Sequence, residues 1–236
     1  MFFYITQDNK IFNKKFANKV YIPKKAKIIY FKTSDNIFLE GGYVVNKKNV
    51  PLVLYFNGNT NNILEFLDNI TTKITDFNFI GFNYPGYARS QGKPCERCIL
   101  KYACEIFDKY KPEIIIGRSL GTAVATYVAS KREIKKLILI TPFDSIEDIA
   151  KIKYPFLPVR LMLKHKFKEI DWIKKVKVPV YVILAENENL IPKKCVENLL
   201  KNIPNLKSVK IIKNATHGNI LQNEETIDVL KSFLGD

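Results

Sequence analysis

The stretch Gly117-Arg118-Ser119-Leu120-Gly121 gives the first indication of the architecture. It directly follows the largely apolar run 113–116, typical of a buried strand, and directly precedes the helix-like run 122–129. Ser119 therefore lies at a sharp strand-to-helix turn, where its backbone angle is unfavourable. A Cβ atom two residues before or after it would collide with the neighbouring strand or helix, which explains the two glycines. The pattern predicts a hydroxyl lifted clear of a sheet.

Short apolar runs alternate with helix-period segments on both sides of this turn. Strands are expected at residues 28–31, 37–45, 52–56, 77–82, 114–116, 137–140, 180–184 and 209–212. The first two fit an antiparallel pair. The later runs, each followed by a crossover helix, are what a parallel sheet covered on both faces requires. The sequence thus predicts an α/β fold with eight strands. The first 25 residues fit either an irregular lead-in or an extra strand.

The length and composition are typical of one large domain. No linker rich in Ser, Gly or Pro interrupts the 236 residues, so we expect a single domain over residues 1–236. No apolar run reaches the ~18 residues that span a bilayer. Residues 1–5 are too short for the apolar region of a signal peptide and lack preceding positive charges. The expected localisation is cytoplasmic.

The formal net charge of +15 raises the question of an anionic partner. Only 5 of the 38 basic residues are arginine, which is the better fork for phosphate, and the lysines are scattered. Abundant Lys, Asn and Ile together are typical of an AT-rich genome, so we expect no nucleic-acid partner. A local concentration of lysines still favours weak association with anionic membrane surfaces. It comprises Lys164, Lys166, Lys168, Lys174, Lys175 and Lys177.

The four cysteines lack the spacing of a disulfide framework. Cys95 and Cys98 form a Cys-x-x-Cys, but a structural zinc site needs four ligands and a second pair is missing. Helical spacing after Pro94 puts the pair on the first turn of a helix. We expect this pair, together with Cys104 and Cys195, to be ordinary reduced thiols, and we expect no metal.

Polar loops follow the predicted parallel strands, at the edge where ligands of open sheets collect. A serine hydroxyl needs a base within hydrogen-bond reach, and histidine has the side chain whose ordinary pKa suits that work at about pH 7. The chain has 2 histidines. His217 lies in the loop after the last predicted strand and is the expected base. His165, in a lysine-rich segment far from any strand end, is expected to be an ordinary surface histidine.

A carboxylate is expected on the far nitrogen of the imidazole, because it fixes the tautomer and stabilises the imidazolium. Glu188, after the seventh strand, gives the chain order Ser, acid, His and is the favoured candidate. Asp144, after the sixth strand, is the alternative acid, and Glu186 is a third candidate. The carboxylates that do not serve are expected to be solvated at the surface.

An oxyanion needs two main-chain N–H donors, one after the nucleophile and one from the loop after the third strand. Those donors are expected at Leu120 and Asn59. The Asn- and Gly-rich character of residues 57–62 would also suit a simple turn.

Together these residues resemble the α/β-hydrolase superfamily, and within it the serine-aminopeptidase-like branch that includes bud-emergence-type hydrolases and protein depalmitoylases. The resemblance covers most of positions 50–220 and rests on residues 55–59, 84–87, 90, 92, 94, 117–123, 142–143, 145, 154–157 and 178–180. It implies the α/β-hydrolase fold, with an eight-stranded, mostly parallel sheet covered by helices on both faces. Residues 142–178 would form a short helical insertion instead of a full cap.

The insertion holds apolar residues that would line an acyl pocket or else belong to the core. They are Tyr154, Phe156, Leu157, Leu161, Met162, Leu163 and Phe167. The chain also departs from the pattern of the family, which has His-Gly-Asn at 57–59, Gly at 88 and 216, and Asp at 188. Glu188 is one methylene longer than an aspartate and can serve if its loop retreats slightly.

The sequence therefore predicts a serine hydrolase of the carboxylesterase or thioesterase type, acting on a small-molecule or acylated substrate through an acyl-enzyme, with no cofactor. Ser119, His217 and Glu188 would form the triad. One alternative is a peptidase resembling aminopeptidases, although the chain shows no acidic cluster to anchor an α-amine. The other is a non-catalytic binding protein with a basic surface on a hydrolase scaffold.

Overall fold

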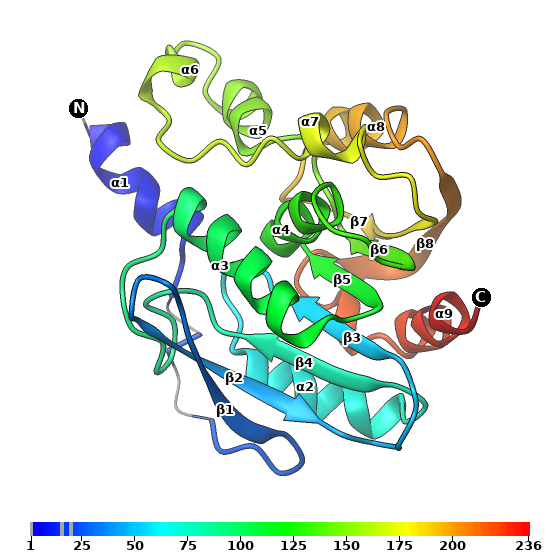
Figure 1. Ribbon diagram of the computed structural model, residues 1–236. Coiled ribbons are helices and arrows are strands. Elements are labelled where there is room, and N and C mark those ends of the chain that lie inside the picture. The colour runs from blue at the N-terminus through cyan, green and yellow to red at the C-terminus, as the bar shows by residue number, and fades with distance from the viewer. Residues whose placement is uncertain (1, 15–16, 19–20) are drawn as a thin grey trace.

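The centre of the molecule is an eight-stranded sheet with the order β1-β2-β4-β3-β5-β6-β7-β8 (Figure 1). The structure is a computed structural model and describes residues 2–14, 17–18 and 21–236. β1 pairs with β2 and β2 with β4 in antiparallel fashion, and the other neighbours are parallel. The strands are β1 (Lys27–Lys32), β2 (Phe38–Val44), β3 (Leu52–Phe56), β4 (Asn78–Phe82), β5 (Ile114–Arg118), β6 (Lys136–Ile140), β7 (Val180–Asn187) and β8 (Leu206–Thr216). The predicted α/β fold with a mostly parallel sheet is confirmed.

Helices cover both faces of the sheet, as the apolar strands require. α3, α4, α7 and α8 pack on one face, and α2 and α9 on the other. The helices are α1 (Phe2–Ile11), α2 (Ile63–Lys73), α3 (Glu96–Tyr110), α4 (Leu120–Ala129), α5 (Ile146–Lys153), α6 (Val159–Met162), α7 (Glu169–Ile173), α8 (Lys193–Leu200) and α9 (Glu224–Gly235), with a 3₁₀ turn at Ile220–Gln222.

The alternation along a central strand shows how one sequence fills two cores. In β5, Ile115 belongs to the cluster that packs under α3 and α4, whereas Ile114 and Ile116 belong to the cluster under α2 and α9. Successive side chains of a strand point to opposite faces, so a run of isoleucines serves both layers. The turn after β5 is thereby held from both sides.

The N-terminal segment differs from the prediction of a lead-in or an extra strand. Residues 2–11 form the helix α1, and Phe12, just beyond it, is buried. Gln7 holds the helix in place, since its side chain donates to the Met162 oxygen at 3.0 Å and accepts from the Lys164 amide at 2.7 Å. The segment lacks a periodic apolar face, so long-range contacts rather than local pattern define it. Residues 1, 15–16 and 19–20 lie outside the described residues.

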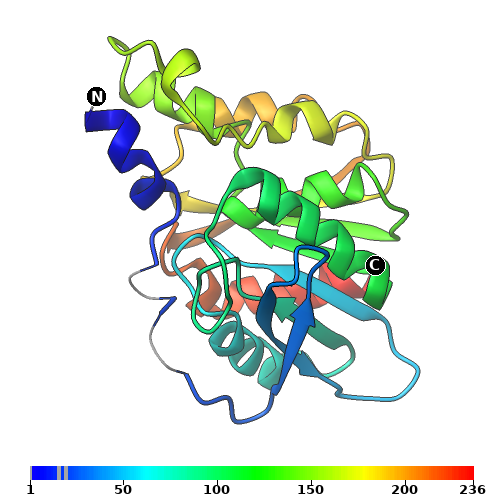
Figure 2. The ribbon, with the colours of Figure 1, turned by 60° about the vertical axis from the view of Figure 1, so that its left-hand side comes forward.

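Three short helices, α5, α6 and α7, fill the connection between β6 and β7. Figures 1 and 2 show α5 and α6 standing out from the sheet on the same side as α1. None of the helices within residues 2–14 and 21–236 combines the length and the apolar character needed to cross a membrane. β7 and β8 run further than predicted and end at Asn187 and Thr216. Glu188 and His217 are consequently the first residues beyond two neighbouring parallel strands.

Candidate active site

Ser119 lies at the turn between β5 and α4, with a positive φ of 50° and a ψ of −121°. A Cβ added at Gly117 would overlap the Gly121 oxygen, and one added at Gly121 would overlap the Phe56 oxygen. The two glycines are therefore required by the close approach of strand and helix. A serine with a strained backbone at a sharp strand-to-helix turn is typical of a nucleophile elbow.

The imidazole of His217 bridges Ser119 and Glu188. Its Nε2 atom lies 2.9 Å from Ser119 Oγ, and its Nδ1 atom lies 2.8 Å from Glu188 Oε2. Ser119 and His217 are each only 9% exposed, so the hydrogen-bonded chain is sheltered from water. Three loops, after β5, β7 and β8, bring together a hydroxyl, an imidazole and a carboxylate in the arrangement that lets a serine lose its proton.

The Glu188 carboxylate is held in its charged form. Burial alone would raise its pKa, but the hydrogen bond to His217 and those from the main-chain amides of Ile191 and Leu190 outweigh burial and keep the pKa below its ordinary value. These amides donate to Oε1 at 3.1 and 2.8 Å. One carboxylate oxygen is thus anchored by its own loop, and the other faces the imidazole.

The two other carboxylates considered from the sequence bind elsewhere. Asp144 accepts from the Ser145 amide at 2.6 Å and from the Asn198 side chain at 2.9 Å. It is buried, so the expectation that it would be a solvated surface group is wrong, and this burial raises its pKa. Glu186 is exposed and accepts from the Asn214 amide at 2.8 Å, which ties β7 to the end of β8.

Leu120 and Asn59 lie beside Ser119 at one cavity. Within the described part of the chain, neither main-chain N–H donates to a protein acceptor. The Asn59 side chain donates to the Ile11 oxygen at 3.1 Å, and the Asn59 oxygen accepts from the Tyr87 hydroxyl at 3.1 Å. Asn59 is therefore fixed by contacts that leave its amide available to an incoming oxygen.

The cavity at Ser119 has a volume of about 250 Å³ and mostly apolar walls. The insertion contributes Tyr154 and Leu163, as anticipated, but Phe167 is fully buried in the core and Phe156 faces solvent. The contribution of α1 to this lining could not be predicted from the sequence, because no motif marks it. The lining is Gln7, Lys10, Ile11, Asn59, Ser119, Leu120, Phe143, Ile146, Ile149, Ala150, Lys153, Tyr154, Leu163, Leu190 and Ile191.

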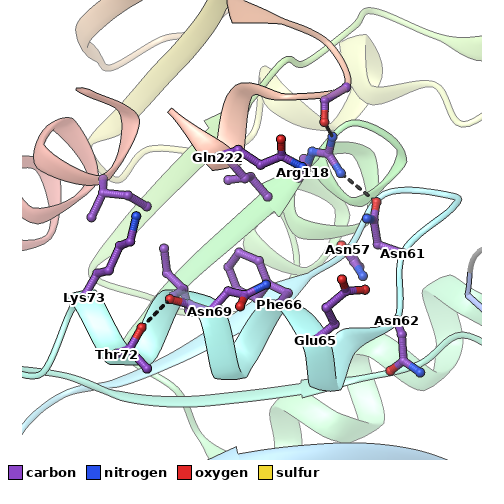
Figure 3. A pocket seen from close by; sticks show the side chains of 14 residues that line it. Asn57, Asn61, Asn62, Glu65, Phe66, Asn69, Thr72, Lys73, Arg118 and Gln222 are labelled. Carbon is purple, nitrogen blue, oxygen red and sulfur yellow. Dashed lines mark hydrogen bonds between the residues drawn. The ribbon is translucent and has the colours of Figure 1, made fainter. Parts of the chain in front are cut away.

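A second cavity, of about 400 Å³, lies between α2, the 3₁₀ turn and the loop after β3 (Figure 3). Its lining combines polar side chains with apolar ones such as Phe66 and Leu221, and does not include Ser119. Figure 3 shows Arg118 next to Asn61, and its guanidinium donates a hydrogen bond to the Asn61 side chain at 2.7 Å. Arg118 occupies a variable position of the Gly-x-Ser-x-Gly motif, so the motif predicts no role for it.

Two expectations away from the site are wrong. Cys95 and Cys98 form a disulfide instead of remaining reduced, because the start of α3 brings their Cα atoms to 5.2 Å. His165 is not a surface residue: its side chain is 13% exposed and its Nδ1 atom accepts from the Glu96 amide at 3.3 Å. Burial lowers the pKa of His165. Cys104 and Cys195 are free, as expected.

The sheet order and the helices on both of its faces are those of the α/β-hydrolase fold. A profile of the family described as "alpha/beta hydrolase fold" matches residues 51–163. Among solved structures, the chain is similar to the esterase Pf2001 of Pyrococcus furiosus, with a TM-score of 0.70, 20% identity, and coverage of 92% of this chain and 95% of that one. The chain therefore has the α/β-hydrolase fold.

The curated relatives include proteins of several kingdoms. An uncharacterized protein of Mycobacterium tuberculosis is 27% identical over 65% of this chain and 58% of its own length. Protein bem46 of Schizosaccharomyces pombe is 26% identical over 70% of this chain and 61% of its own length. The lysophosphatidylserine lipase ABHD12 of Xenopus tropicalis is 26% identical over 79% and 58%. The matches thus span about three fifths of these relatives.

Proposed function

We propose that this chain is a serine hydrolase that cleaves carboxylic esters or thioesters through an acyl-enzyme. The observation that carries the proposal is the continuous hydrogen-bonded chain from Ser119 Oγ through His217 to Glu188, with links of 2.9 and 2.8 Å, beside an apolar cavity. The similarity to an esterase and to a lipase supports the same reaction class.

In the first half-reaction, Ser119 Oγ forms a bond to the carbonyl carbon while its proton passes to His217 Nε2. Negative charge develops on the carbonyl oxygen, and the amides of Leu120 and Asn59 would hold it. Loss of one such donor typically costs about 3 kcal/mol of transition-state stabilisation. The C–O bond of the ester, or the C–S bond of the thioester, then breaks. His217 returns the proton to the oxygen or sulfur of the leaving group.

In the second half-reaction, water attacks the acyl-enzyme, His217 takes the water proton, and the acid product leaves as Ser119 recovers its hydrogen. Glu188 keeps the same imidazole tautomer throughout and stabilises the imidazolium without taking its proton. The lowered pKa of Glu188 supports this role, because hydrogen bonds outweighing burial keep the carboxylate ionised.

The walls of the cavity favour an acyl chain over a peptide. They include Ile149 and Leu163, and the charged residues of the lining are Lys10 and Lys153. A substrate α-amine is cationic, so two lysines at the lining disfavour it. The peptidase alternative therefore receives no support from the site.

The test is a series of p-nitrophenyl esters of rising acyl length, with an acyl thioester and a peptidyl p-nitroanilide for comparison. We expect turnover of esters or thioesters, no cleavage of the anilide, and loss of turnover in Ser119→Ala. Folded protein that hydrolyses neither ester nor thioester, but binds polyanions with unchanged affinity in Ser119→Ala, would instead support the non-catalytic alternative.

A further inference from the structure

The outer edge of the insertion exposes a group of large apolar side chains. We call this group the cap edge; it consists of Ile152, Phe156, Leu157 and Leu161. Phe156 is 97% exposed and Leu161 is 85% exposed. Single apolar residues at a surface are ordinary, but these four lie within ten consecutive positions, from the end of α5 to α6. Figure 1 shows this part of the chain at the outer limit of the molecule, away from the sheet.

The surroundings of the cap edge are cationic. Residues 146–168 contain six Lys or Arg and two acidic residues. Both acids are already paired, since Lys151 Nζ lies 2.8 Å from Glu147 and 2.8 Å from Asp148. Lys10 of α1 adds a further positive charge, because its Nζ atom donates to the Tyr154 hydroxyl at 3.2 Å. Such a surface matches an anionic bilayer, because its apolar side chains fit the acyl-chain region and its cations fit the anionic headgroups.

The cap edge also borders the cavity at Ser119. α5 presents Ile149 and Ala150 to that cavity and Ile152 to solvent. Leu190, from the loop that carries Glu188, lines the cavity and is itself 47% exposed. Lys153 joins the two rims, since its Nζ atom donates to the Leu190 oxygen at 2.7 Å. A surface bound at the cap edge would lie next to the entrance of the cavity.

We propose that the cap edge docks this protein on a bilayer surface that carries anionic phospholipid. Phe156 and Leu161 enter the boundary of headgroups and acyl chains, while Lys153 and Arg160 remain among the phosphates. A second copy of the chain is the less favourable occupant, because two facing cap edges would bring like charges together. The proposal concerns binding, so it does not depend on turnover at Ser119.

The experiment is flotation of the Ser119→Ala protein with phosphatidylcholine vesicles that contain or lack phosphatidylglycerol. We expect binding only with phosphatidylglycerol, and weaker binding as salt rises. Replacing Phe156 and Leu161 together by serine should weaken binding about tenfold or more. Ile22→Ser is the matched control, because Ile22 is 81% exposed and lies outside the insertion. It should leave binding unchanged.

Charge reversal at the exposed Arg160 supplies a second variant that removes no apolar surface. Arg160→Glu should weaken binding to the anionic vesicles, and thermal unfolding of each variant reports that the fold is intact. The proposal is overturned if the Ser119→Ala protein does not bind anionic vesicles, or if the variant with both serine replacements binds them equally well. A dimer that the double variant dissociates, without vesicle binding, overturns it in favour of a second copy. Ester turnover could be absent while this binding persists, and only the proposed function would then fail.

Discussion

The guanidinium of Arg118 donates a hydrogen bond of 2.8 Å to the main-chain oxygen of His217. The same group donates to the Gly218 oxygen at 3.3 Å and to the Asn61 side chain at 2.7 Å. Arg118 immediately precedes Ser119, so one buried residue ties the turn that carries the hydroxyl to the loop that carries the imidazole. Arg118 therefore stabilises the 2.9 Å contact between Ser119 and His217 by holding their two loops together.

Removing the Arg118 guanidinium should slow the chemical step more than it weakens substrate binding. We expect Arg118→Met to lower kcat by about 10- to 100-fold, because a charged hydrogen bond to a buried carbonyl typically contributes about 1.5–3 kcal/mol. KM should change little, since Arg118 does not line the cavity at Ser119. Steady-state kinetics with a p-nitrophenyl ester measure both constants. Asn61→Ala removes one of the partners and should have the smaller effect. An unchanged kcat in folded Arg118→Met would show that His217 does not need the anchor.

Glu169 is a fully buried carboxyl beneath the helix that follows Ser119. Its oxygens lie 2.7 Å from the Thr122 hydroxyl and 2.8 Å from the Thr126 hydroxyl. The Thr122 hydroxyl also donates to the Ser119 oxygen at 2.6 Å. A hydroxyl has one proton, so Thr122 cannot fully satisfy both acceptors at once. Burial raises the pKa of Glu169 from its ordinary 4.5 to about 8.

The raised pKa of Glu169 predicts a stability that falls as pH rises. Between about pH 4.5 and 8 the folded protein retains a proton that the unfolded chain releases. The free energy of unfolding should therefore fall by up to about 1.4 kcal/mol per pH unit in that window. Glu169→Gln removes the titration and should flatten this part of the profile. Urea unfolding of both proteins across the window measures the effect, and parallel profiles would contradict it.

The disulfide can be counted chemically. Ellman's reagent added to protein unfolded without reductant should report two thiols, those of Cys104 and Cys195. Prior reduction should raise the count to four, because the pair at 95 and 98 is then opened. Four thiols before reduction would mean that the pair is reduced, as the sequence analysis expected.

The cavity walls should set the acyl length that is accepted. Ile149→Trp fills space beside Ser119 and should lower kcat/KM for a long acyl ester by about tenfold or more, because displaced methylenes each lose about 0.8 kcal/mol of burial. Activity on the acetate ester should be retained. Ile211→Trp, on the exposed side of β8, serves as the control. Equal losses for acetate and long esters would place the acyl chain elsewhere.

The elements that the sequence predicted best are those with a local signal. The apolar run of β5 predicts a strand, and the glycines around Ser119 predict the sharp turn that follows it. The position of Glu188 and His217 after β7 and β8 follows from the same logic, since parallel strands end at one edge. The structure places both side chains on one imidazole-centred chain of hydrogen bonds.

The features that the sequence could not predict depend on distant partners. The residues of α1 lack the periodic apolar face that predicts a helix. The helix is held instead by hydrogen bonds between the Gln7 side chain and the main chain at residues 162 and 164. The burial of Asp144 depends on Asn198 of α8, which is 54 positions away. Arg118 has its partners in two other loops. Each of these contacts becomes visible only when the sheet has brought the loops together.

The proton path from Ser119 through His217 to Glu188 is tested most directly by the rate of Ser119 modification. A fluorophosphonate probe followed by peptide mass spectrometry measures how fast the adduct forms on that residue. We predict labelling of Ser119 in the parent, slowed by roughly a thousandfold or more in His217→Ala and strongly slowed in Glu188→Gln. Glu188→Asp should retain part of the rate. Folded parent protein that leaves Ser119 unlabelled, or labelling at the same rate after His217→Ala, would contradict the account.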